Sequence, residues 1–367
     1  MFPILCYNRG DRAKGGKTMQ IRSDFIGGNI RLVNQTGTDV YLENELRDTI
    51  EDWFYWAFCV EGVAEQTLCF HFQKNRLGYW GPAVSHDLVH WHWLGDVQGD
   101  CFTYTFSQDE NKVYFAHHML YHPDRFFAFC RRHEIEIKEL CRGRLGTSVP
   151  CITLGSGDQS MILTARHHAC ESTGNYVLEG VLEQLLKTPL PNTRILCVPF
   201  VDYDGVLNGD QGKARAPYDH NRDYLEPSIY PETKAIREYA DRFGCHYGFD
   251  FHSPWHKGKT NDTMFVVRNR EDKTVCFDRF SILLESELTP DSMKYKIEND
   301  YPVNTGWNFP KRSFGIGMHR RPECKLAHTL ESTYFGTSDN QVQAERLVAF
   351  GRAYARAILK YEEGELR

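Results

Sequence analysis

The first third of the chain alternates short aromatic and β-branched runs with polar, glycine-containing turns. Four such runs lie at residues 52–60, 67–72, 101–106 and 112–116. Their length and spacing are typical of strands in an antiparallel sandwich. We therefore predict an N-terminal antiparallel β-sandwich domain over residues 19–135.

The hydrophobic pattern changes after Cys141. Short apolar runs predict buried strands at residues 148–154, 161–165, 194–201 and 246–251, whereas apolar positions at helical spacing predict helices at residues 172–187 and 231–243 and a long C-terminal helix. Strands that alternate with helices indicate a sheet covered on both sides. The pattern predicts an α/β catalytic domain over residues 136–367, with a mixed, largely parallel sheet flanked by helices.

Residues 1–18 are polar and glycine-rich after a short apolar start, and we predict a flexible leader there. The apolar start is too short for the hydrophobic region of a secretory signal. Met19 is an alternative translation start, because a strand-like run begins just beyond it.

The composition narrows the classes of protein. Hydrophobic residues at 41% can build cores in both regions, and a charged fraction of 25% argues against wholesale disorder. A net charge of −6 argues against binding of nucleic acid driven by global charge. No apolar run approaches the roughly 20 residues of a membrane span, so we expect neither nucleic acid nor membrane as a partner.

The 12 cysteines are spread widely along the chain and include no Cys-x-x-Cys pair. This spacing predicts reduced, mostly buried thiols in a cytoplasmic protein. It argues against a thiolate zinc site of the ribbon or finger type.

A candidate metal site lies where predicted strands end. His168 and Glu171 follow one predicted strand and precede a helix, and His252 ends another strand. Sites assemble at this edge of open α/β sheets. Two histidines and one carboxylate leave an open coordination position, which is the catalytic rather than the structural zinc pattern. Asp250 lies two residues before His252, so it faces the same way and can orient the imidazole.

Two further groups of histidines have a density that would suit a metal. They are His90 with His92, and His117 with His118 and His122. No cysteine or carboxylate completes either group at ligand spacing, so we expect surface or packing histidines. The remaining catalytic candidate is Glu331, which ends an apolar stretch and could act as a general base.

Four motifs resemble those of the zinc metallocarboxypeptidases of the carboxypeptidase A superfamily, in particular the cytosolic carboxypeptidase branch. The motifs are His-x-x-Glu at 168–171, Asp-Gly-Val-x-x-Gly at 204–209 leading to Asn-Arg at 221–222, Asp-x-His at 250–252, and Thr-x-Glu-Ser-Thr at 329–333. Segments at 23–30, 53–56 and 113–116 resemble the β-sandwich domain that precedes the catalytic domain in that branch. The resemblance covers nearly the whole chain from Met19 and implies a zinc carboxypeptidase fold.

The resemblance implies a metallocarboxypeptidase that hydrolyses the C-terminal amide bond of peptides or proteins. It implies one zinc ion per chain, held by His168, Glu171 and His252. A metal-activated water would attack the amide, and Glu331 would be the general base.

Substrate binding is implied for Asn221 and Arg222. The planar guanidinium of Arg222 matches a terminal carboxylate bidentately. A surface ion pair with Asp219 or Asp223 is the structural alternative for this arginine.

The sequence departs from the branch at the residue that polarises the scissile carbonyl. The branch usually has an arginine there, and the corresponding position is Gly212. We favour Arg215 as the replacement, with Lys213 as the alternative.

The pocket for the C-terminal side chain is less well defined by the sequence. Arg320 occupies the place of an arginine of the branch, and Arg312 and Arg321 lie in the same segment. Gly315 stands where a further basic residue would recognise an acidic side chain. The preference for an acidic or another C-terminal residue therefore stays open.

Two other functions are compatible with parts of the pattern. An aspartoacylase-like zinc amidohydrolase would use the same ligands on small acylated amino acids, but such enzymes lack the aromatic β domain. A catalytically silent peptide-binding protein would keep a vestigial zinc site, although all three ligands and Glu331 are present. The sequence does not indicate an oligomeric state.

Overall fold

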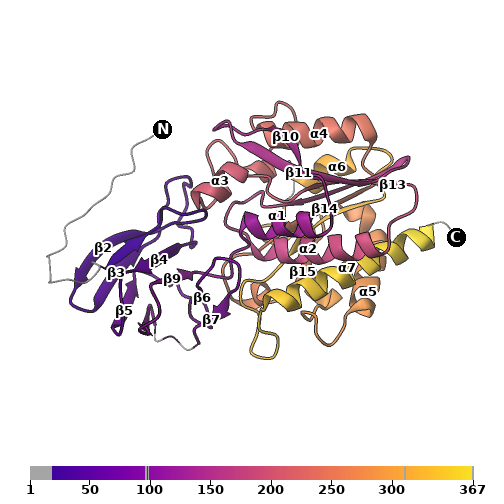
Figure 1. Cartoon of the computed structure of the whole chain (residues 1–367). Helices are drawn as coiled ribbons and strands as arrows, with labels where there is room; N and C mark the ends of the chain where they lie inside the picture. The colour runs from indigo at the N-terminus through magenta and orange to yellow at the C-terminus, as the bar shows by residue number, and fades with distance from the viewer. Residues whose placement is uncertain (1–18, 96, 98, 310, 366–367) are drawn as a thin grey trace.

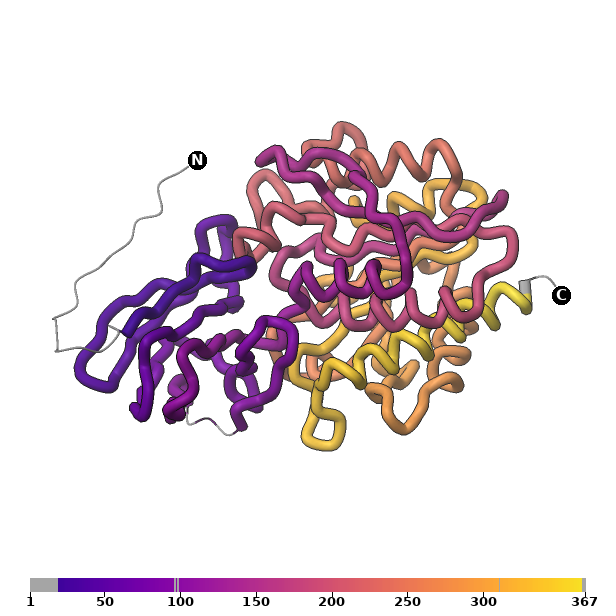
Figure 2. Tube along the Cα trace, in the orientation of Figure 1, coloured from indigo at the N-terminus to yellow at the C-terminus, as the bar shows by residue number. Residues whose placement is uncertain are grey.

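The computed structural model describes residues 19–365 apart from positions 96, 98 and 310. The predicted leader lies outside the described residues. Figure 1 shows an N-terminal region of strands beside a larger region of strands and helices, and the tube in Figure 2 follows the chain from one into the other.

The N-terminal region contains two sheets. The four-stranded sheet has the order β2 (Arg31–Thr36), β3 (Asp39–Glu43), β5 (Thr67–Phe72), β8 (Cys101–Thr105). The five-stranded sheet has the order β1 (Gln20–Arg22), β4 (Ala57–Glu61), β9 (Lys112–Ala116), β6 (Ala83–Ser85), β7 (His92–Trp93). The pairings are antiparallel except that of β3 with β5, which is parallel.

Phenylalanines from both sheets share one hydrophobic core. Phe70 of β5 stacks on Phe102 of β8, and Phe58 of β4 stacks on Phe115 of β9. Phe70 also contacts Phe115, with ring centroids 5.4 Å apart, so the core joins the two sheets. The alternation of buried and exposed positions along β5 follows from this one-sided burial.

The strand expected at residues 52–60 is shorter in the structure. Only Ala57–Glu61 pairs as β4, and the aromatic residues Trp53–Trp56 precede it. The backbone N–H of Tyr55 donates to Gln211 Oε1 at 3.0 Å, so its hydrogen bond goes to the C-terminal region rather than to a strand. The aromatic run fills the space between the two regions instead of extending the sheet.

The C-terminal region is built on a seven-stranded sheet. Its order is β10 (Lys138–Arg142), β11 (Ser148–Gly155), β13 (Thr193–Val198), β12 (Gln159–Ala165), β14 (Tyr247–His252), β16 (Leu326–Glu331), β15 (Phe265–Val267). The central pairings from β13 to β16 are parallel. The outer pairings are antiparallel, so the sheet is mixed and its parallel part is central.

Helices cover both faces of this sheet. They are α1 (Pro123–Arg132), α2 (Thr173–Lys187), α3 (Tyr203–Asn208), α4 (Pro231–Phe243), α5 (Thr274–Glu287), α6 (Phe314–His319) and α7 (Ala344–Glu365). Figure 1 shows α4 and α6 on one side and α2, α5 and α7 on the other. None of these helices combines the length and apolar character that a membrane span requires.

The sequence pattern did not predict α1. Its residues Phe126 and Phe129 are buried in the core of the C-terminal region, although α1 falls within the expected β domain. His122 caps the helix by accepting a hydrogen bond from the backbone N–H of Asp124, so this histidine has a structural role.

The α2 and α7 helices cross at two glycines. A Cβ atom at Gly180 would lie 2.0 Å from the carbonyl oxygen of Val348, and one at Gly351 would lie 2.0 Å from that of Val177. Only residues without a side chain allow the helix backbones to approach so closely. This crossing anchors α7 beside α2, the helix that directly follows His168 and Glu171.

Candidate active site

Strand register brings the candidate residues to one edge of the sheet. His252 and Glu331 are register partners at the ends of β14 and β16. Asp250 is the partner of Thr164 on β12, and the chain leaves β12 directly into the loop that carries His168 and Glu171. The carboxyl ends of three neighbouring parallel strands therefore meet at the site, as expected for an α/β sheet.

The ligand atoms of three buried residues converge in this place. His168 Nδ1 lies 3.1 Å from His252 Nδ1 and 2.9 Å from Glu171 Oε1. His252 Nδ1 lies 2.7 Å from Glu171 Oε2. Ligand atoms around one tetrahedral zinc ion, at about 2.0–2.1 Å from the metal, are about 3.3 Å apart. The donor set fits a single zinc ion.

The outer nitrogens of both histidines face carboxylates. His252 Nε2 lies 2.6 Å from Asp250 Oδ2, and His168 Nε2 lies 3.5 Å from Asp219 Oδ1. Burial opposes ionisation of Asp250, but His167 and His252 nevertheless hold its pKa well below the usual range. A hydrogen-bonded carboxylate such as Asp250 fixes the tautomer of a metal-binding histidine. Asp250 was expected from the sequence, whereas Asp219 was considered only as an ion-pair partner of Arg222.

A second buried trio, His167 with Asp250 and His252, also has ligand atoms close together. Both nitrogens of His167 are engaged, with Nδ1 at 2.8 Å from Asp250 Oδ1 and Nε2 at 2.5 Å from the Tyr224 hydroxyl. His167 therefore has no lone pair left for a metal. It positions Asp250. This role was not predicted from the sequence, because only the neighbouring His168 of the motif was considered there.

A buried arginine holds the loop between β12 and α2. Arg166 has a positive φ of 62° and is 5% exposed. Its Nε donates to the carbonyl oxygen of Ala169, and its Nη1 donates to Ser172 Oγ. The guanidinium thus closes the loop around His168 and Glu171, a contribution that no local sequence pattern indicated.

Cys170, inside the same loop, packs against aromatic residues. It is fully buried and lies in a cluster with Trp53 and Tyr334. Burial raises the pKa of its thiol, which therefore stays protonated. These contacts agree with a small packing residue at this position.

Glu331 lies beside the convergent ligands. Its carboxylate is buried, and Oε2 accepts no hydrogen bond from the described residues. Burial raises the pKa of Glu331 to about 7, and the negative charge of Glu171 adds to the rise. A carboxylate with a pKa near neutrality can both accept and return a proton.

A cavity of about 360 Å³ opens in front of these residues. His168, His252 and Glu331 contribute to its wall. Further polar side chains in the wall are those of Lys213, Asn221, Arg222, Asn269, Asn308 and Ser313. The metal ligands, the carboxylate and several polar groups therefore face one space.

The structure corrects the preference for Arg215. This guanidinium forms ion pairs with Asp48, Asp202 and Asp210 and does not line the cavity. Lys213 lines the cavity instead, with Nζ 3.2 Å from His168 Nδ1 and 3.5 Å from Glu171 Oε1. Of these two basic residues, the one that faces the site is therefore Lys213, which was the alternative predicted from the sequence.

Gly212 explains why the arginine of the branch is missing at that position. Its φ is +74°, and a Cβ atom would lie 2.0 Å from the backbone nitrogen of Ala169. Any side chain there would collide with the backbone of the loop that carries His168 and Glu171. Asp48, from the N-terminal region, accepts a hydrogen bond from the Gly212 N–H at 2.7 Å and so fixes this approach.

Asn221 and Arg222 both line the cavity. Asn221 Oδ1 accepts a hydrogen bond from the Phe314 N–H, while Nδ2 lies 3.3 Å from His252 Nε2. Arg222 Nη1 donates to the carbonyl oxygen of Asn221. No ion pair among the described residues joins Arg222 to Asp219 or Asp223, so the structural alternative for this arginine is not observed.

The arginines expected near the side-chain pocket point elsewhere. Arg320 is exposed at the end of α6 and does not line the cavity, contrary to its expected role in binding. Arg312 donates to the carbonyl oxygens of Arg222 and Leu225, and Arg321 pairs with Asp241. The physical reason is that backbone and acidic partners already engage Arg312 and Arg321.

Gly315 leaves no room for a basic side chain. A Cβ atom there would lie 1.9 Å from Asn269 Nδ2, because the amide of Asn269 fills this space. Asn269 donates to the carbonyl oxygen of Ala327, and its Oδ1 is buried without a hydrogen bond from the described residues. The pocket therefore presents a neutral amide where a basic residue would recognise an acidic side chain.

The N-terminal region contributes directly to the cavity. Glu51 and Trp53 line it, and Lys213 Nζ lies 5.5 Å from the centre of the Trp53 ring. Trp255 of the C-terminal region contacts Trp53 edge to face at 4.8 Å between ring centroids. An aromatic wall thus spans both regions at the site.

The other histidine groups have no metal-like geometry. His90 is exposed and pairs with Asp87. His117 and His118 are buried, with their Nδ1 atoms 3.0 Å apart, and His117 Nε2 lies 2.9 Å from His256 Nδ1. Burial lowers the pKa of all three of these histidines, so they are neutral packing residues.

Solved structures identify the fold. A metallo-carboxypeptidase from Burkholderia cenocepacia is 20% identical with a TM-score of 0.76, and the match covers 95% of this chain and 100% of that one. One from Pseudomonas aeruginosa, in complex with (2-guanidinoethylmercapto)succinic acid, is 21% identical with a TM-score of 0.77 and the same coverage. The fold is that of the metallocarboxypeptidases. No family model matches the chain.

Sequence relatives narrow the class further. Cytosolic carboxypeptidase 2 of Danio rerio is 26% identical over 264 residues, which is 65% of this chain and 34% of the relative. The human protein of that name is 23% identical over 298 residues, covering 71% and 32%. An uncharacterised protein of Zymomonas mobilis is 29% identical over 258 residues, covering 64% and 67%. The chain is similar to the cytosolic carboxypeptidases and spans about a third of the length of those that it matches.

Proposed function

We propose that this protein is a zinc-dependent metallocarboxypeptidase that removes residues from the C-termini of peptides. The observation that carries the proposal is the position of Glu331. Its unpartnered carboxylate oxygen lies in the cavity that His168 and His252 also line. A metal site with an adjacent buried carboxylate suits hydrolysis of an amide.

His168, Glu171 and His252 would hold the zinc ion through the inward-facing atoms described above. When bound, the ion supplies the Lewis acidity that makes water nucleophilic at neutral pH. Glu331 accepts the proton of the attacking water and delivers it to the leaving amide nitrogen. Asp250 keeps His252 in the required tautomer, and the negative charge of Asp219 faces the outer nitrogen of His168.

Lys213 and Arg222 each stabilise one negative charge: Lys213 the developing oxyanion, and Arg222 the terminal carboxylate of the substrate. Lys213 lies beside the ligands, so its ammonium stabilises the oxyanion that develops on the scissile carbonyl. Arg222 and Asn221 bind the terminal carboxylate of the substrate, which only a chain end offers. This division makes the site an exopeptidase site.

We infer a two-domain organisation, with a β-sandwich domain up to residue 135 and the catalytic domain after it. Glu51 and Trp53 of the first domain would shape the entrance for a peptide. The contribution of these two residues to the cavity disfavours an amidohydrolase for small acylated amino acids, because such a substrate needs no extended binding surface. The presence of all ligands and Glu331 likewise disfavours a silent binding protein.

A cytoplasmic location is part of the same proposal. None of the described cysteines forms a disulfide, and most of them are buried. This usage of cysteine suits a reducing compartment.

Mass spectrometry of a peptide library tests the proposed activity. The zinc-loaded protein should remove single C-terminal residues, and Glu331→Gln should bind zinc but leave the library intact. The identity of the residues lost would also reveal the side-chain preference. An intact library with the zinc-loaded wild-type protein would contradict the proposal, as would equal turnover by Glu331→Gln.

A further inference from the structure

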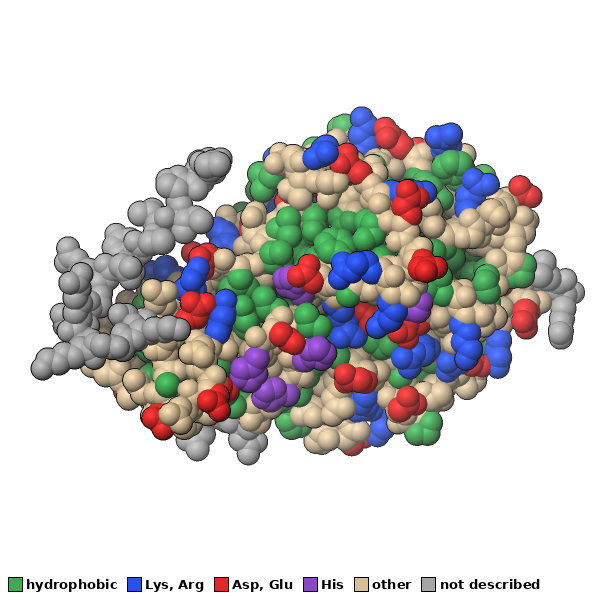
Figure 3. All heavy atoms as spheres, in the orientation of Figure 1, with side chains coloured by type: hydrophobic (Ala, Val, Ile, Leu, Met, Phe, Trp, Pro, Cys, Tyr) green, Lys and Arg blue, Asp and Glu red, His purple; other side chains and the backbone are tan. Residues whose placement is uncertain are grey.

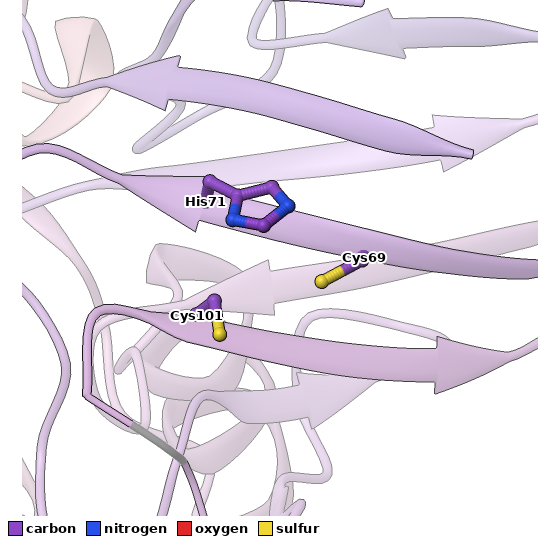
Figure 4. Close-up of side chains that lie close together, drawn as sticks. All are labelled: Cys69, His71 and Cys101. Carbon is purple, nitrogen blue, oxygen red and sulfur yellow. The ribbon is translucent and has the colours of Figure 1, made fainter. Parts of the chain in front are cut away.

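A second cluster of metal-binding side chains lies on the four-stranded sheet, away from the cavity. Cys69 and His71 are two residues apart on β5, so their side chains point to the same face. Cys101 on β8 is the register partner of His71. The ligand atoms of the three residues lie within 4.8 Å of one another, and Figure 4 shows the three side chains close together.

The cluster lies outside the hydrophobic core. Phe70 and Phe72, which alternate with Cys69 and His71, belong to the core between the two sheets. The three cluster residues are half-buried on the opposite face. An ion can reach them from solvent, and packing does not account for two thiols and an imidazole at this position.

A carboxylate orients the imidazole of the cluster. His71 Nε2 lies 2.7 Å from Asp39 Oδ1, and Asp39 is the register partner of Cys69 on β3. Tyr41 stacks on the ring of His71 with centroids 4.7 Å apart. Metal-binding histidines commonly donate their second N–H to a carboxylate, which leaves the other nitrogen, here Nδ1, for the ion.

The strand register disfavours a disulfide between the two cysteines. Cys69 is paired with Thr103, so Cys69 and Cys101 are diagonal rather than opposite neighbours. Diagonal residues of an antiparallel pair are about 7–8 Å apart, whereas a disulfide usually spans about 4.4–6.8 Å between Cα atoms. A metal ion bridges a longer gap, because two thiolates on one zinc ion are about 3.7 Å apart.

We propose that Cys69, His71 and Cys101 form a second metal site for a thiophilic transition-metal ion, zinc in the first place. Three protein ligands leave the fourth position to solvent. Each S–H bond breaks as a metal–sulfur bond forms, and both protons pass to solvent, so binding strengthens as pH rises.

Strand pairing explains why the sequence did not reveal this site. The expectation against a thiolate zinc site relied on the absence of Cys-x-x-Cys, whereas here the two thiols are brought together by the pairing of β5 with β8. The β8 strand is the edge strand of its sheet. An ion held by both strands would fasten this edge.

Cobalt(II) titration of the full chain tests the proposal. Chelator-treated protein, kept reduced with a phosphine, should bind two equivalents of cobalt. One equivalent should produce strong near-ultraviolet charge-transfer absorption from sulfur to cobalt. The active-site ligands contain no sulfur, so this absorption reports the second site alone, whether or not the chain is a peptidase.

Cys69→Ser/Cys101→Ser should lose the charge-transfer absorption and bind one equivalent of cobalt. His71→Asn should weaken the absorption without removing a thiol. The matched control is Cys276→Ser, a half-buried cysteine of α5, which should leave the absorption unchanged. Absence of the absorption in the wild-type protein, or its persistence in the double variant, would overturn the proposal.

Discussion

His252 and Glu331 lie side by side as register partners at the ends of parallel strands β14 and β16. Neighbouring strands are about 4.8 Å apart, and paired positions direct their side chains to the same face. The sheet itself therefore sets the spacing between a metal ligand and the proposed base. No flexible loop has to bring Glu331 into place.

Replacement of this carboxylate should separate metal binding from turnover. Glu331→Gln should retain zinc, because the three ligands are untouched, but kcat should fall by about 10²–10⁴, the usual contribution of general acid–base catalysis. Zinc content by elemental analysis and peptide hydrolysis would be measured on the same sample. His252→Gln is the contrasting variant and should lose both metal and activity. Loss of zinc from Glu331→Gln would contradict the assigned role.

Lys213 and Arg215 should respond differently to loss of charge. Lys213→Met should lower kcat by about 10²–10³ with an unchanged melting temperature, because it removes a group that stabilises developing charge. Arg215→Met should instead destabilise the fold by about 3–5 kcal/mol, because it leaves buried aspartates unpaired. Steady-state kinetics and urea unfolding distinguish the two effects. The reverse pattern would restore Arg215 to the site.

Arg222 should determine the requirement for a free chain end. The wild-type protein should cleave a peptide with a free carboxylate much faster than its C-terminal amide. Arg222→Met should reduce that ratio by at least about tenfold, mainly through KM, because a charge-assisted hydrogen bond contributes about 1.5–3 kcal/mol. Lys311→Met, at an exposed position, is the control for loss of a positive charge. An unchanged ratio in Arg222→Met would exclude this residue from carboxylate binding.

The glycine crossing of α2 and α7 should be sensitive to a single methyl group. Gly351→Ala would place Cβ against the carbonyl oxygen of Val177, and the helices would have to separate. Overpacking of this kind costs about 1–3 kcal/mol, which outweighs the gain of about 1 kcal/mol in helix propensity. Urea unfolding should show the loss, whereas Lys187→Ala at the exposed end of α2 should not. A stabilised Gly351→Ala would show that the helices are not in close contact.

Acid should destabilise the protein through its buried neutral histidines. Burial lowers the pKa of His118, His256 and His328 to about 3, whereas the unfolded chain has histidines near 6.5. Below about pH 6.5 the unfolded state binds more protons, so the free energy of unfolding falls as pH falls towards 3. Urea unfolding of the zinc-free protein from pH 7.5 to 4.5 measures this slope. His328→Gln should make the slope shallower, and His90→Asn, which is exposed, should not change it.

Much of the fold and part of the candidate site could be predicted from the sequence. Helical spacing predicted α2 and α4 closely. The motif residues His168, Glu171 and His252 lie together in the structure, as their places at the ends of strands predicted. The α1 helix was missed because its sequence is rich in aromatic residues, like the strands that precede it. Hydrophobic pattern alone did not distinguish them.

The choice between Lys213 and Arg215 lay beyond local sequence. Both are basic residues of one loop, and their directions depend on the left-handed backbone of Gly212 and on Asp48, which is far away in the chain. His167 and Asp219 were missed for the same reason, since their roles arise from contacts across the site. Tertiary partners decide which polar side chain enters a cavity.

The contribution of Glu51 and Trp53 to the lining of the cavity has a consequence for how the site can change. The metal ligands and the proposed base come from one part of the sequence, while these two residues come from another. Substitutions at these two positions can therefore change the shape of the cavity opening while the proposed metal ligands and Glu331 stay the same. The selectivity of the site and its chemistry can change independently of each other.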